Sequence, residues 1–238
     1  HPYKDYGHRM QFPCGGQVKL NGVRCLAKRT GDTINFTSRK GKSYNETLQH
    51  LVPELLQKLP DGETSDGEIY IHGKSLQTIV SYVKKLRPES KQLQYWIYDL
   101  AKTGIPCEER AAQYQTLIKD NPMDFLDVDT EVEEDFVIEE HSDTPKVFAL
   151  PCIEINSPDD IKAAHDKAVQ DGFEGLILRN KKGEYTFDHR SADLQKYKEF
   201  IDEEFEIIGG RTPDTGRYAG GCIFLCKTKS GGEFEVTP

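Results

Sequence analysis

The sequence lacks the long hydrophobic runs of a membrane protein. No segment approaches the roughly 18 consecutive apolar residues that a membrane span needs. Residues 1–12 are polar and lack the apolar central region of a signal peptide. Of the 238 residues, 36% are hydrophobic and 30% are charged, which is typical of a soluble protein with one large domain or one large and one small domain. We therefore expect no membrane partner.

Closely paired cysteines are also scarce. Of the six cysteines, only Cys222 and Cys226 lie near each other in the sequence. Because a second close pair is missing, the four-cysteine pattern of a structural zinc site is absent, and we predict free thiols.

Lysine and arginine are missing from residues 124–143, a block that holds ten acidic side chains. We interpret this block as a solvated loop. The formal net charge is −9, and removing these ten negative charges leaves +1. Because the local field, and not the net charge, steers a polyanion, the acidic total does not exclude a nucleic-acid partner.

Hydrophobic spacing predicts helices and short strands in alternation. Residues 74–86 carry an apolar stripe, and a second helix opens at Ser157 and Pro158 and ends at Gly172. Further helices are predicted over 108–119 and over 45–59, the latter interrupted or kinked at Pro53. Strands are predicted over 17–28, 33–38, 68–72, 94–100, 174–179 and 193–198. Without a regular βαβ rhythm, this pattern indicates an α+β fold of antiparallel sheets flanked by helices.

The pattern changes after residue 201. Three strands, 204–208, 220–229 and 232–237, follow one another across glycine-rich turns with no helical stripe between them. Three strands cannot close a barrel, so we interpret them as the start of a small β-barrel. The predicted domains are therefore 1–201 and 202–238.

One lysine is a candidate nucleophile. Lys19 opens the run Lys19-Leu20-Asn21-Gly22-Val23-Arg24. A lysine amine can attack the α-phosphate of a nucleotide and hold the nucleotidyl group as a phosphoramidate if positive charge lies nearby. Alternation along the predicted strand places Lys19 on the face opposite Val18 and Leu20, and Gly22 lets a ligand approach the backbone.

Further candidates lie on other predicted strands. In Asp66-Gly67-Glu68 a predicted turn feeds a strand, which lets Glu68 reach a ribose hydroxyl or a metal ion. Lys196 and Lys198 share one face of the last strand. Two like charges this close are unfavourable unless an anion lies between them, so the pair predicts a phosphate clamp.

These segments together resemble the motifs of the covalent nucleotidyltransferases, the family of ATP-dependent DNA ligases, RNA ligases and mRNA capping enzymes. The order of the segments matches as well as their residues. The matching segments are Lys19 to Arg24, Ser38-Arg39-Lys40-Gly41, Asp66-Gly67-Glu68, Tyr95-Trp96-Ile97-Tyr98-Asp99, Glu174-Gly175-Leu176-Ile177-Leu178-Arg179 and Leu194-Gln195-Lys196-Tyr197-Lys198. Within the family, the last two of these segments are most similar to ATP-dependent DNA ligases, particularly those of the compact phage and bacterial kind.

The resemblance implies roles for individual residues. Lys19 would take AMP from ATP, helped by the positive charges of Arg24, Lys196 and Lys198 and of Mg²⁺. Glu174 and Glu68 would hold that Mg²⁺ ion. Tyr98 would stack on adenine, and Arg39 and Arg24 would contact the AMP phosphate or the 5′-phosphate of a nick.

The resemblance also implies a fold, a reaction and a setting. Residues 1–201 would form a nucleotidyltransferase (adenylation) domain, and 202–238 the beginning of an OB-fold. The enzyme would use ATP to seal nicks in duplex DNA, with contacts mostly to phosphates. We expect a monomer in the cytoplasm of a bacterial cell or a phage-infected host.

Two departures keep alternatives open. Asn21 stands where the first motif usually carries Asp, and the sixth family motif, a late basic stretch, has no counterpart before Pro238. The alternatives are an RNA ligase, an mRNA capping guanylyltransferase, or a module that binds nicks without chemistry. An NAD-dependent ligase is disfavoured because its four-cysteine zinc arrangement is missing.

Overall fold

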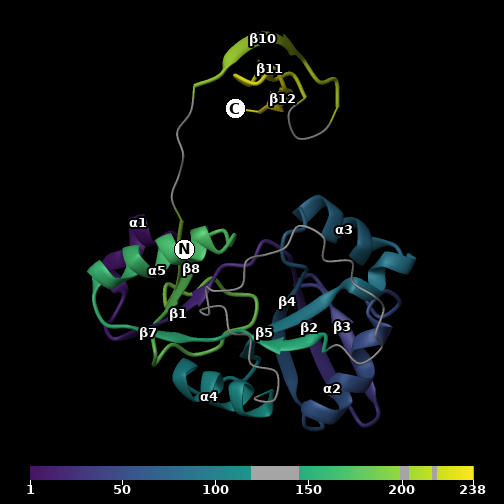
Figure 1. Ribbon diagram of the computed structural model, residues 1–238, viewed down its shortest axis with the longest axis vertical. Helices are drawn as coiled ribbons and strands as arrows, with labels where there is room; N and C mark the ends of the chain where they lie inside the picture. The colour runs from purple at the N-terminus through teal and green to yellow at the C-terminus, as the bar shows by residue number, and fades with distance from the viewer. Residues whose placement is uncertain (119–144, 199–203, 216–218, 238) are drawn as a thin grey trace. The chain divides into compact units, whose positions relative to one another are not determined.

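The computed structural model describes residues 1–118, 145–198, 204–215 and 219–237 (Figure 1). The chain divides into two compact units, His1–Lys198 and Glu199–Pro238, each of which is described by itself. The acidic block at 124–143 and the predicted domain boundary between residues 201 and 202 both lie outside the described residues.

The larger unit contains a five-stranded sheet with the order β3-β2-β4-β5-β6. Its neighbouring strands are antiparallel, except that β5 and β6 run parallel. Aromatic and β-branched residues fill β5, the strand type in which such side chains pack best. The strands are β2 (Val23–Thr30), β3 (Thr33–Thr37), β4 (Thr64–Tyr70), β5 (Gln94–Leu100) and β6 (Val147–Ala149).

A second sheet of the same unit has four strands in the order β7-β1-β8-β9, all antiparallel. Its central strands β1 and β8 are mostly buried, while β9 has one exposed end. The strands are β1 (Cys14–Val18), β7 (Ile153–Ile155), β8 (Leu176–Arg179) and β9 (Leu194–Tyr197).

Helices cover both sheets. Helix α2 packs against β3, α3 against β2 and β4, α4 against β5, α5 against β7 and β8, and α1 against β9. None of the helices in the described residues has the length and hydropathy of a membrane span. The helices are α1 (Tyr3–Tyr6), α2 (Val52–Lys58), α3 (Leu76–Lys84), α4 (Cys107–Leu117) and α5 (Pro158–Gln170), with 3₁₀ helices η1 (Gly7–Arg9), η2 (Gln49–Leu51) and η3 (Pro88–Gln92).

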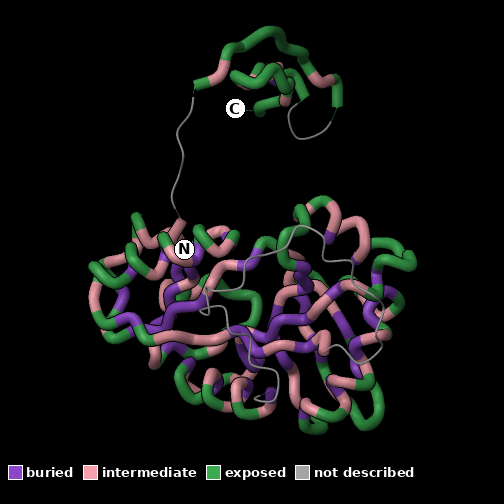
Figure 2. The backbone as a smooth tube through the Cα atoms, viewed as in Figure 1, coloured by how far each residue is buried: buried purple, intermediate pink, exposed green. Residues whose placement is uncertain are grey.

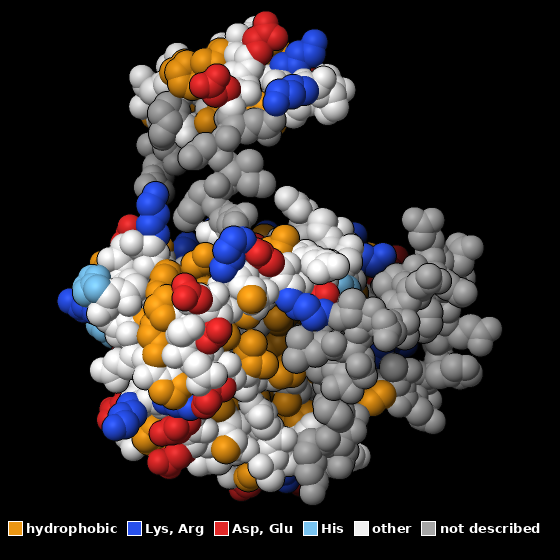
Figure 3. Space-filling view, turned by 60° about the vertical axis from the view of Figure 1, so that its left-hand side comes forward, with side chains coloured by type: hydrophobic (Ala, Val, Ile, Leu, Met, Phe, Trp, Pro, Cys, Tyr) orange, Lys and Arg blue, Asp and Glu red, His pale blue; other side chains and the backbone are white. Residues whose placement is uncertain are grey.

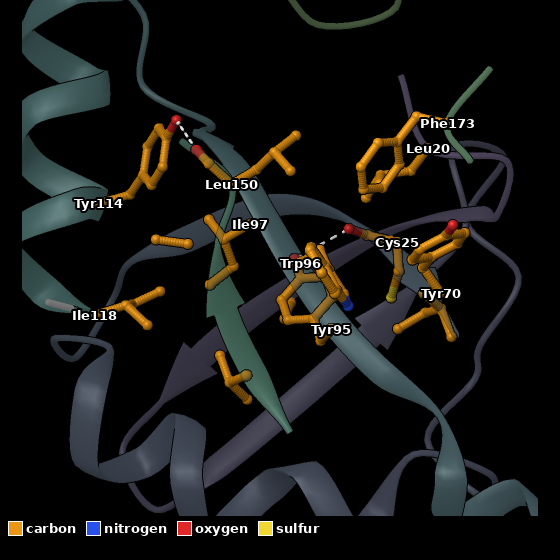
Figure 4. Close-up of a cluster of buried hydrophobic side chains, with 14 of the residues drawn as sticks. Leu20, Cys25, Tyr70, Tyr95, Trp96, Ile97, Tyr114, Ile118, Leu150 and Phe173 are labelled. Atoms are coloured by element: carbon orange, nitrogen blue, oxygen red, sulfur yellow. Dashed lines mark hydrogen bonds between the residues drawn. The ribbon is translucent and has the colours of Figure 1, made fainter. Parts of the chain in front are cut away.

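The hydrophobic core lies along the strands, where buried backbone concentrates in Figure 2. Large aromatic side chains at its centre have partners for their hydroxyl groups (Figure 4). The Tyr95 hydroxyl donates to the carbonyl of Cys25 at 3.1 Å, and the Tyr114 hydroxyl donates to the carbonyl of Leu150 at 2.8 Å. Buried tyrosines are tolerated when such partners exist. All six cysteines are free thiols, as predicted.

The strand predicted over 17–28 is wrong as a single element. It is two strands in two different sheets, β1 and β2, and the chain crosses between them at residues 19–22. Leu20 is buried in the core at this crossing, and a side chain at Gly22 would collide with the carbonyl of Ile69. The alternation of Val18 and Leu20 therefore reflects burial at a crossing and not a continuous strand.

Two other elements differ from their predictions. The helix expected over 45–59 begins only at Val52, because Pro53 lies in its first turn and starts the helix instead of kinking it. The turn predicted at Asp66-Gly67-Glu68 lies inside β4. A side chain on Gly67 would lie 2.5 Å from the carbonyl oxygen of Trp96, so this strand position requires glycine.

The smaller unit contains three consecutive antiparallel strands in the order β10-β11-β12. They match the predicted run of strands across glycine-rich turns. Ile207, Ile208 and Val236 are exposed on this sheet. The strands are β10 (Glu206–Arg211), β11 (Ile223–Lys227) and β12 (Glu233–Val236).

Candidate active site

A cavity of about 570 Å³ in the larger unit is lined by strands of both sheets. This volume is within the usual range for a bound small molecule. Seven Lys and Arg side chains line it against five Asp and Glu, so its walls carry excess positive charge. On the face shown in Figure 3, by contrast, acidic, basic and hydrophobic side chains are interspersed. Of the predicted site residues, the lining includes Lys19, Arg24, Arg39, Glu68, Tyr98 and Lys196.

Lys19 is held by its backbone at the crossing between β1 and β2. Its amide donates to the carbonyl of Gly175 at 2.8 Å, and the amide of Glu174 donates to the carbonyl of Lys19 at 3.1 Å. The next residue, Leu20, is buried and lies beside Phe173 in Figure 4. Lys19 is therefore anchored on both sides although it belongs to no strand.

Two lysines share one carboxylate at this position. The ammonium of Lys19 donates to Oε2 of Glu174, and that of Lys198 donates to Oε1 at 3.0 Å. Burial alone would raise the pKa of Glu174, but the hydrogen bonds from Lys19 and Lys198 outweigh it and lower the pKa. The three side chains keep 23%, 28% and 30% exposure for Lys19, Glu174 and Lys198 respectively, so solutes can reach all of them.

The predicted lysine pair of the last strand is divided between two positions. Lys196 lies in β9 and lines the cavity. Lys198 follows the end of β9 and binds Glu174 instead of lining the cavity. Lys196 therefore lines the same cavity as Lys19, and Lys198 shares the carboxylate of Glu174 with Lys19.

Arg24 is fixed by a buried acid that the sequence reasoning did not select. Asp66, only 2% exposed, accepts from Arg24 Nε at 2.9 Å and from Arg24 Nη2 at 2.5 Å. It also accepts from the hydroxyls of Tyr98 at 3.0 Å and Tyr185 at 2.8 Å. Burial alone would lower the pKa of Arg24, but the hydrogen bond to Asp66 outweighs it and raises the pKa. Arg24 is thus a permanently charged group in a defined orientation.

A β-bulge sets the orientation of the Tyr98 side chain. The register between β4 and β5 shifts between Asp66 and Gly67, which leaves Tyr98 as the extra residue of a β-bulge. Bulges redirect a side chain near a functional site. The hydroxyl of Tyr98 is on Asp66, and the guanidinium of Arg179 lies 5.5 Å from the centre of its ring.

Glu68 lines the cavity from β4, where a backbone hydrogen bond from Gly22 and the positive charges of Lys19 and Arg24 favour its ionised form. Desolvation raises the pKa of Glu68 to about 8, although the positive charge of Lys19 opposes this shift. The negative charge of Asp66 adds to the increase. A carboxyl group in this state gains stability from any cation that enters the cavity.

A buried charge network forms another part of the cavity wall. Asp99 accepts from Arg110 Nε at 2.7 Å and from Arg179 Nη1 at 2.6 Å. These three side chains are 3–7% exposed and carry two positive charges against one negative. The Nε of Arg179 is buried and has no hydrogen-bond partner among the described residues. The sequence reasoning missed this network because Asp99 and Arg179 lie 80 residues apart.

Arg39 lies where the cavity meets a second hollow of about 720 Å³. A tight turn holds it, in which the amide of Gly41 donates to the carbonyl of Ser38 at 2.9 Å. Gly41 has a φ of +78°, which favours glycine. Arg39 and Lys40 are exposed, and with Arg190 they give this hollow a positive wall.

Metal-binding groups are sparse in this region. Among the described residues, no group of three or more His, Cys, Asp and Glu side chains is arranged to hold a metal ion. The predicted ligands Glu174 and Glu68 therefore do not form a complete site by themselves. A Mg²⁺ ion is commonly held by one or two carboxylates together with substrate phosphates and water, and these two residues fit that mode.

Comparison with solved structures establishes the class of fold. The chain superimposes on a Lig E DNA ligase structure with a TM-score of 0.71, covering 97% of this chain and 80% of that one at 20% identity. The larger unit therefore has the fold of a ligase nucleotidyltransferase domain, as the sequence predicted.

Comparison with sequences establishes the family. The family described as "ATP dependent DNA ligase domain" matches residues 8–198, and the chain belongs to this family. It is 24% identical over 231 residues to a DNA ligase of African swine fever virus, covering 93% of this chain and 50% of the relative. It is 26% identical over 236 residues to the DNA ligase of Enterobacteria phage T4, covering 87% and 48%. The chain thus spans about half the length of these curated relatives.

Proposed function

We propose that this chain carries the adenylylation chemistry of an ATP-dependent DNA ligase and seals nicks in duplex DNA. One observation carries the proposal: in a chain of this family, Lys19 is among the residues that line a cavity with excess positive charge. A lysine in such a setting is suited to attack a phosphate.

The proposed reaction has three steps. The unprotonated amine of Lys19 attacks the α-phosphorus of ATP, forms a P–N bond and expels pyrophosphate. The 5′-phosphate of the nick then attacks the same phosphorus, breaks the P–N bond and takes the AMP group. The 3′-hydroxyl finally attacks the 5′-phosphorus, forms the phosphodiester bond and expels AMP.

The cations of the cavity have separate roles in this proposal. Arg24, held in one orientation by Asp66, and Lys196 stabilise the charge that accumulates on the phosphate oxygens. Lys19 leaves Glu174 to reach the phosphorus, and Lys198 keeps the carboxylate paired meanwhile. Because the side chains of this cluster are partly exposed, its ion pairs cost little to exchange.

Other lining residues would orient the nucleotide and the nick. Tyr98 would stack on the adenine, with its hydroxyl fixed by Asp66 and its ring held by Arg179. Glu68 would accept a hydrogen bond from the ribose. Arg39, at the junction of the two hollows, would contact the 5′-phosphate of the nick.

Magnesium fits this donor set. Glu68 and Glu174 would hold the ion together with nucleotide phosphates and water. When bound, Mg²⁺ supplies charge that offsets the negative phosphates. A bound cation would favour the ionised carboxylate of Glu68, whose pKa burial otherwise raises to about 8.

The proposed partner is nicked duplex DNA. The chain would bind it mainly through phosphates, so the affinity would be sensitive to salt.

We propose that residues 1–201 form the adenylation domain and that 202–238 begin an OB-fold. The units His1–Lys198 and Glu199–Pro238 and the three antiparallel strands of the smaller unit support this division. We further propose a monomer that acts in the cytoplasm of a bacterial cell or a phage-infected host.

The test is covalent labelling of the full chain with ATP carrying ³²P at the α-phosphate, in the presence of Mg²⁺. We expect the wild type to take label and Lys19→Ala to take less than about a thousandth as much, since the nucleophile is gone. The matched control is Lys181→Ala, which also removes a lysine bound to a glutamate, Glu154, but outside the cavity.

Substrate choice is tested in the same assay. ATP and nicked DNA should be preferred to GTP and nicked RNA. Preference for GTP or RNA would assign the chain to a capping enzyme or an RNA ligase. Labelling of Lys19→Ala at the wild-type level would contradict the proposed nucleophile, and a wild type that never takes label would favour a binding module.

A further inference from the structure

Phe187 is an unusual surface residue of the larger unit. Its side chain is 54% exposed, and among the described residues no other Phe, Tyr or Trp side chain is exposed. Single exposed apolar residues are common on proteins, so exposure alone carries no conclusion. The contacts that hold Phe187 and the charges around it indicate what its side chain binds.

The loop between β8 and β9 that carries Phe187 is tied down at several points. The carbonyl of Gly183 accepts from Arg110 at 3.1 Å, and the carbonyl of Lys181 accepts from the amide of Glu108 at 3.0 Å. Each bond joins the loop to α4. The base of the loop is therefore fixed to the body of the domain.

Tyr185 fixes the same loop from the cavity side. Its hydroxyl donates to Asp66 at 2.8 Å and accepts from Arg24 Nη2 at 3.3 Å. The ring of Phe187 lies edge-on to that of Tyr185, with centres 5.1 Å apart. Asp188 then has a φ of +50°, a conformation that few residues other than glycine adopt. Phe187 is thus held outward by a braced loop with little freedom to collapse onto the surface.

The surroundings of Phe187 are positively charged. Its neighbours Asp188 and Arg190 line the second hollow together with Arg39 and Lys40, which gives three cations and one acid. On its other side, Thr186 lines the first cavity. Phe187 therefore lies on the rim between the two hollows, where an apolar ring is next to sites suited to phosphates.

We infer that Phe187 packs against a sugar and base of nicked duplex DNA while Arg39, Lys40 and Arg190 hold its phosphates. An aromatic ring among cations matches a nucleic-acid strand, in which apolar sugar and base surfaces alternate with phosphates. This inference rests on the proposed function and adds a contact to it. It assigns Phe187 to the DNA and not to the nucleotide, because its side chain lines neither hollow.

The experiment measures affinity for a fluorescent duplex with a phosphorylated nick, using the full chain at several salt concentrations. The variants are Phe187→Ala, Phe187→Trp and Arg190→Ala. Leu86→Ala is the matched control, because Leu86 is 53% exposed and lines neither hollow. Melting temperatures identify any variant that has lost its fold.

We expect Phe187→Ala to bind the nick about five- to a hundredfold more weakly and Phe187→Trp to bind within a few fold of the wild type. Loss of an apolar contact should leave the slope of log affinity against log salt unchanged, whereas Arg190→Ala should reduce it by about 1. Leu86→Ala should match the wild type.

Three results would overturn the inference. Phe187→Ala could bind the nick as tightly as Leu86→Ala does, or it could lose affinity only because its melting temperature collapses. Sedimentation could also show that Phe187→Ala breaks a dimer, which would assign this surface to a second copy of the chain. Covalent labelling by ATP is a separate measurement, so failure of the proposed function is distinguishable from failure of this contact.

Discussion

Two clusters in the larger unit have the same formal composition, one carboxylate shared by two cations, but opposite environments. Glu174 pairs with Lys19 and Lys198, and each of these side chains is 23–30% exposed. Asp99 pairs with Arg110 and Arg179, and these are 3–7% exposed.

The chemical difference follows from the environment. A lysine ammonium on a flexible chain can leave one partner for another, while the planar guanidinium of arginine makes several fixed hydrogen bonds. Arg110 and Arg179 therefore suit a permanent wall, and Lys19 and Lys198 suit a cluster that exchanges partners with a substrate. Solvent screening makes the exposed pairs weak, and burial makes the loss of one partner costly.

The largest expected effect breaks the buried cluster. Asp99→Asn removes the only negative charge of that cluster and leaves two guanidiniums buried without it. We expect a loss of about 3–5 kcal/mol in the free energy of unfolding, measured by urea titration. The control is Glu154→Gln, which breaks the surface pair with Lys181 and should cost less than about 1 kcal/mol. Equal losses in the free energy of unfolding of the two variants would contradict the claim that burial makes the loss of one partner costly.

A smaller effect is expected in the exposed cluster, and in activity more than in stability. Glu174→Gln keeps the shape of the side chain but removes the charge that pairs with Lys19 and Lys198. We expect covalent labelling by ATP to fall about ten- to a hundredfold, as is typical when a residue that orients a reactive group is changed. The free energy of unfolding should change by less than about 1 kcal/mol. Glu154→Gln, which removes the partner of Lys181, is the control. Unfolding of Glu174→Gln to the extent of Asp99→Asn would remove the contrast between the clusters.

The smallest effect concerns Glu68, a third carboxyl group in the same cavity. Its pKa is raised from an ordinary 4.5 to about 8, so between these values the folded protein keeps a proton that the unfolded chain releases. The contribution of Glu68 to stability is therefore present below pH 4.5 and lost as the pH rises through 8. Glu68→Gln does not titrate, and we expect it to gain about 1–2 kcal/mol relative to the wild type between pH 5 and pH 8.5.

We expect the stability of Glu174→Gln relative to the wild type to change with pH in the direction opposite to that of Glu68→Gln. The pKa of Glu174 is lowered, so its contribution is present above its ordinary pKa and is lost as the pH falls. Thermal melts of both variants across pH 2–9 should therefore diverge from the wild type in opposite directions, with the change below about pH 4.5 for Glu174→Gln and between pH 4.5 and about 8 for Glu68→Gln. Parallel profiles for the two variants would contradict the assigned environments of Glu68 and Glu174.

Local patterns in the sequence predicted much of the fold. The strand Gln94–Leu100 has the predicted bounds, because the aromatic and β-branched residues 95–98 mark its centre. The helix Pro158–Gln170 opens where expected, since Ser157 and Asp160 cap each other's amides. It ends where Gly172 adopts a φ of +82°. These features depend on residues close in the sequence, so local patterns can predict them.

The crossing at Lys19 shows what local patterns leave open. An apolar alternation is compatible with one long strand, and the close approach of Gly22 to the carbonyl of Ile69 joins residues far apart in the chain. Lys19 lines the cavity, but the sequence pattern assigned it to a continuous strand, which is the wrong element. Its role in the reaction stays a prediction.

The network around Asp66 illustrates a second limit. The motif at Asp66-Gly67-Glu68 drew attention to Glu68, yet Asp66 accepts the hydrogen bonds that fix Arg24 and Tyr98. Tyr185 joins this network from a loop 119 residues away. No periodicity or spacing marks such a tyrosine, because its partner is set by the packing of two sheets.

The reciprocal backbone hydrogen bonds between residue 19 and residues 174 and 175 have a consequence for motion. They hold the two main chains together, so the separation of the Lys19 and Glu174 side chains is set by the rotation of their own single bonds. In the proposed reaction, transfer of the amine from carboxylate to phosphorus would then need no movement of the main chain at residues 19, 174 and 175. Rotation about the side-chain bonds of Lys19 would move its amine while the backbone stays in place.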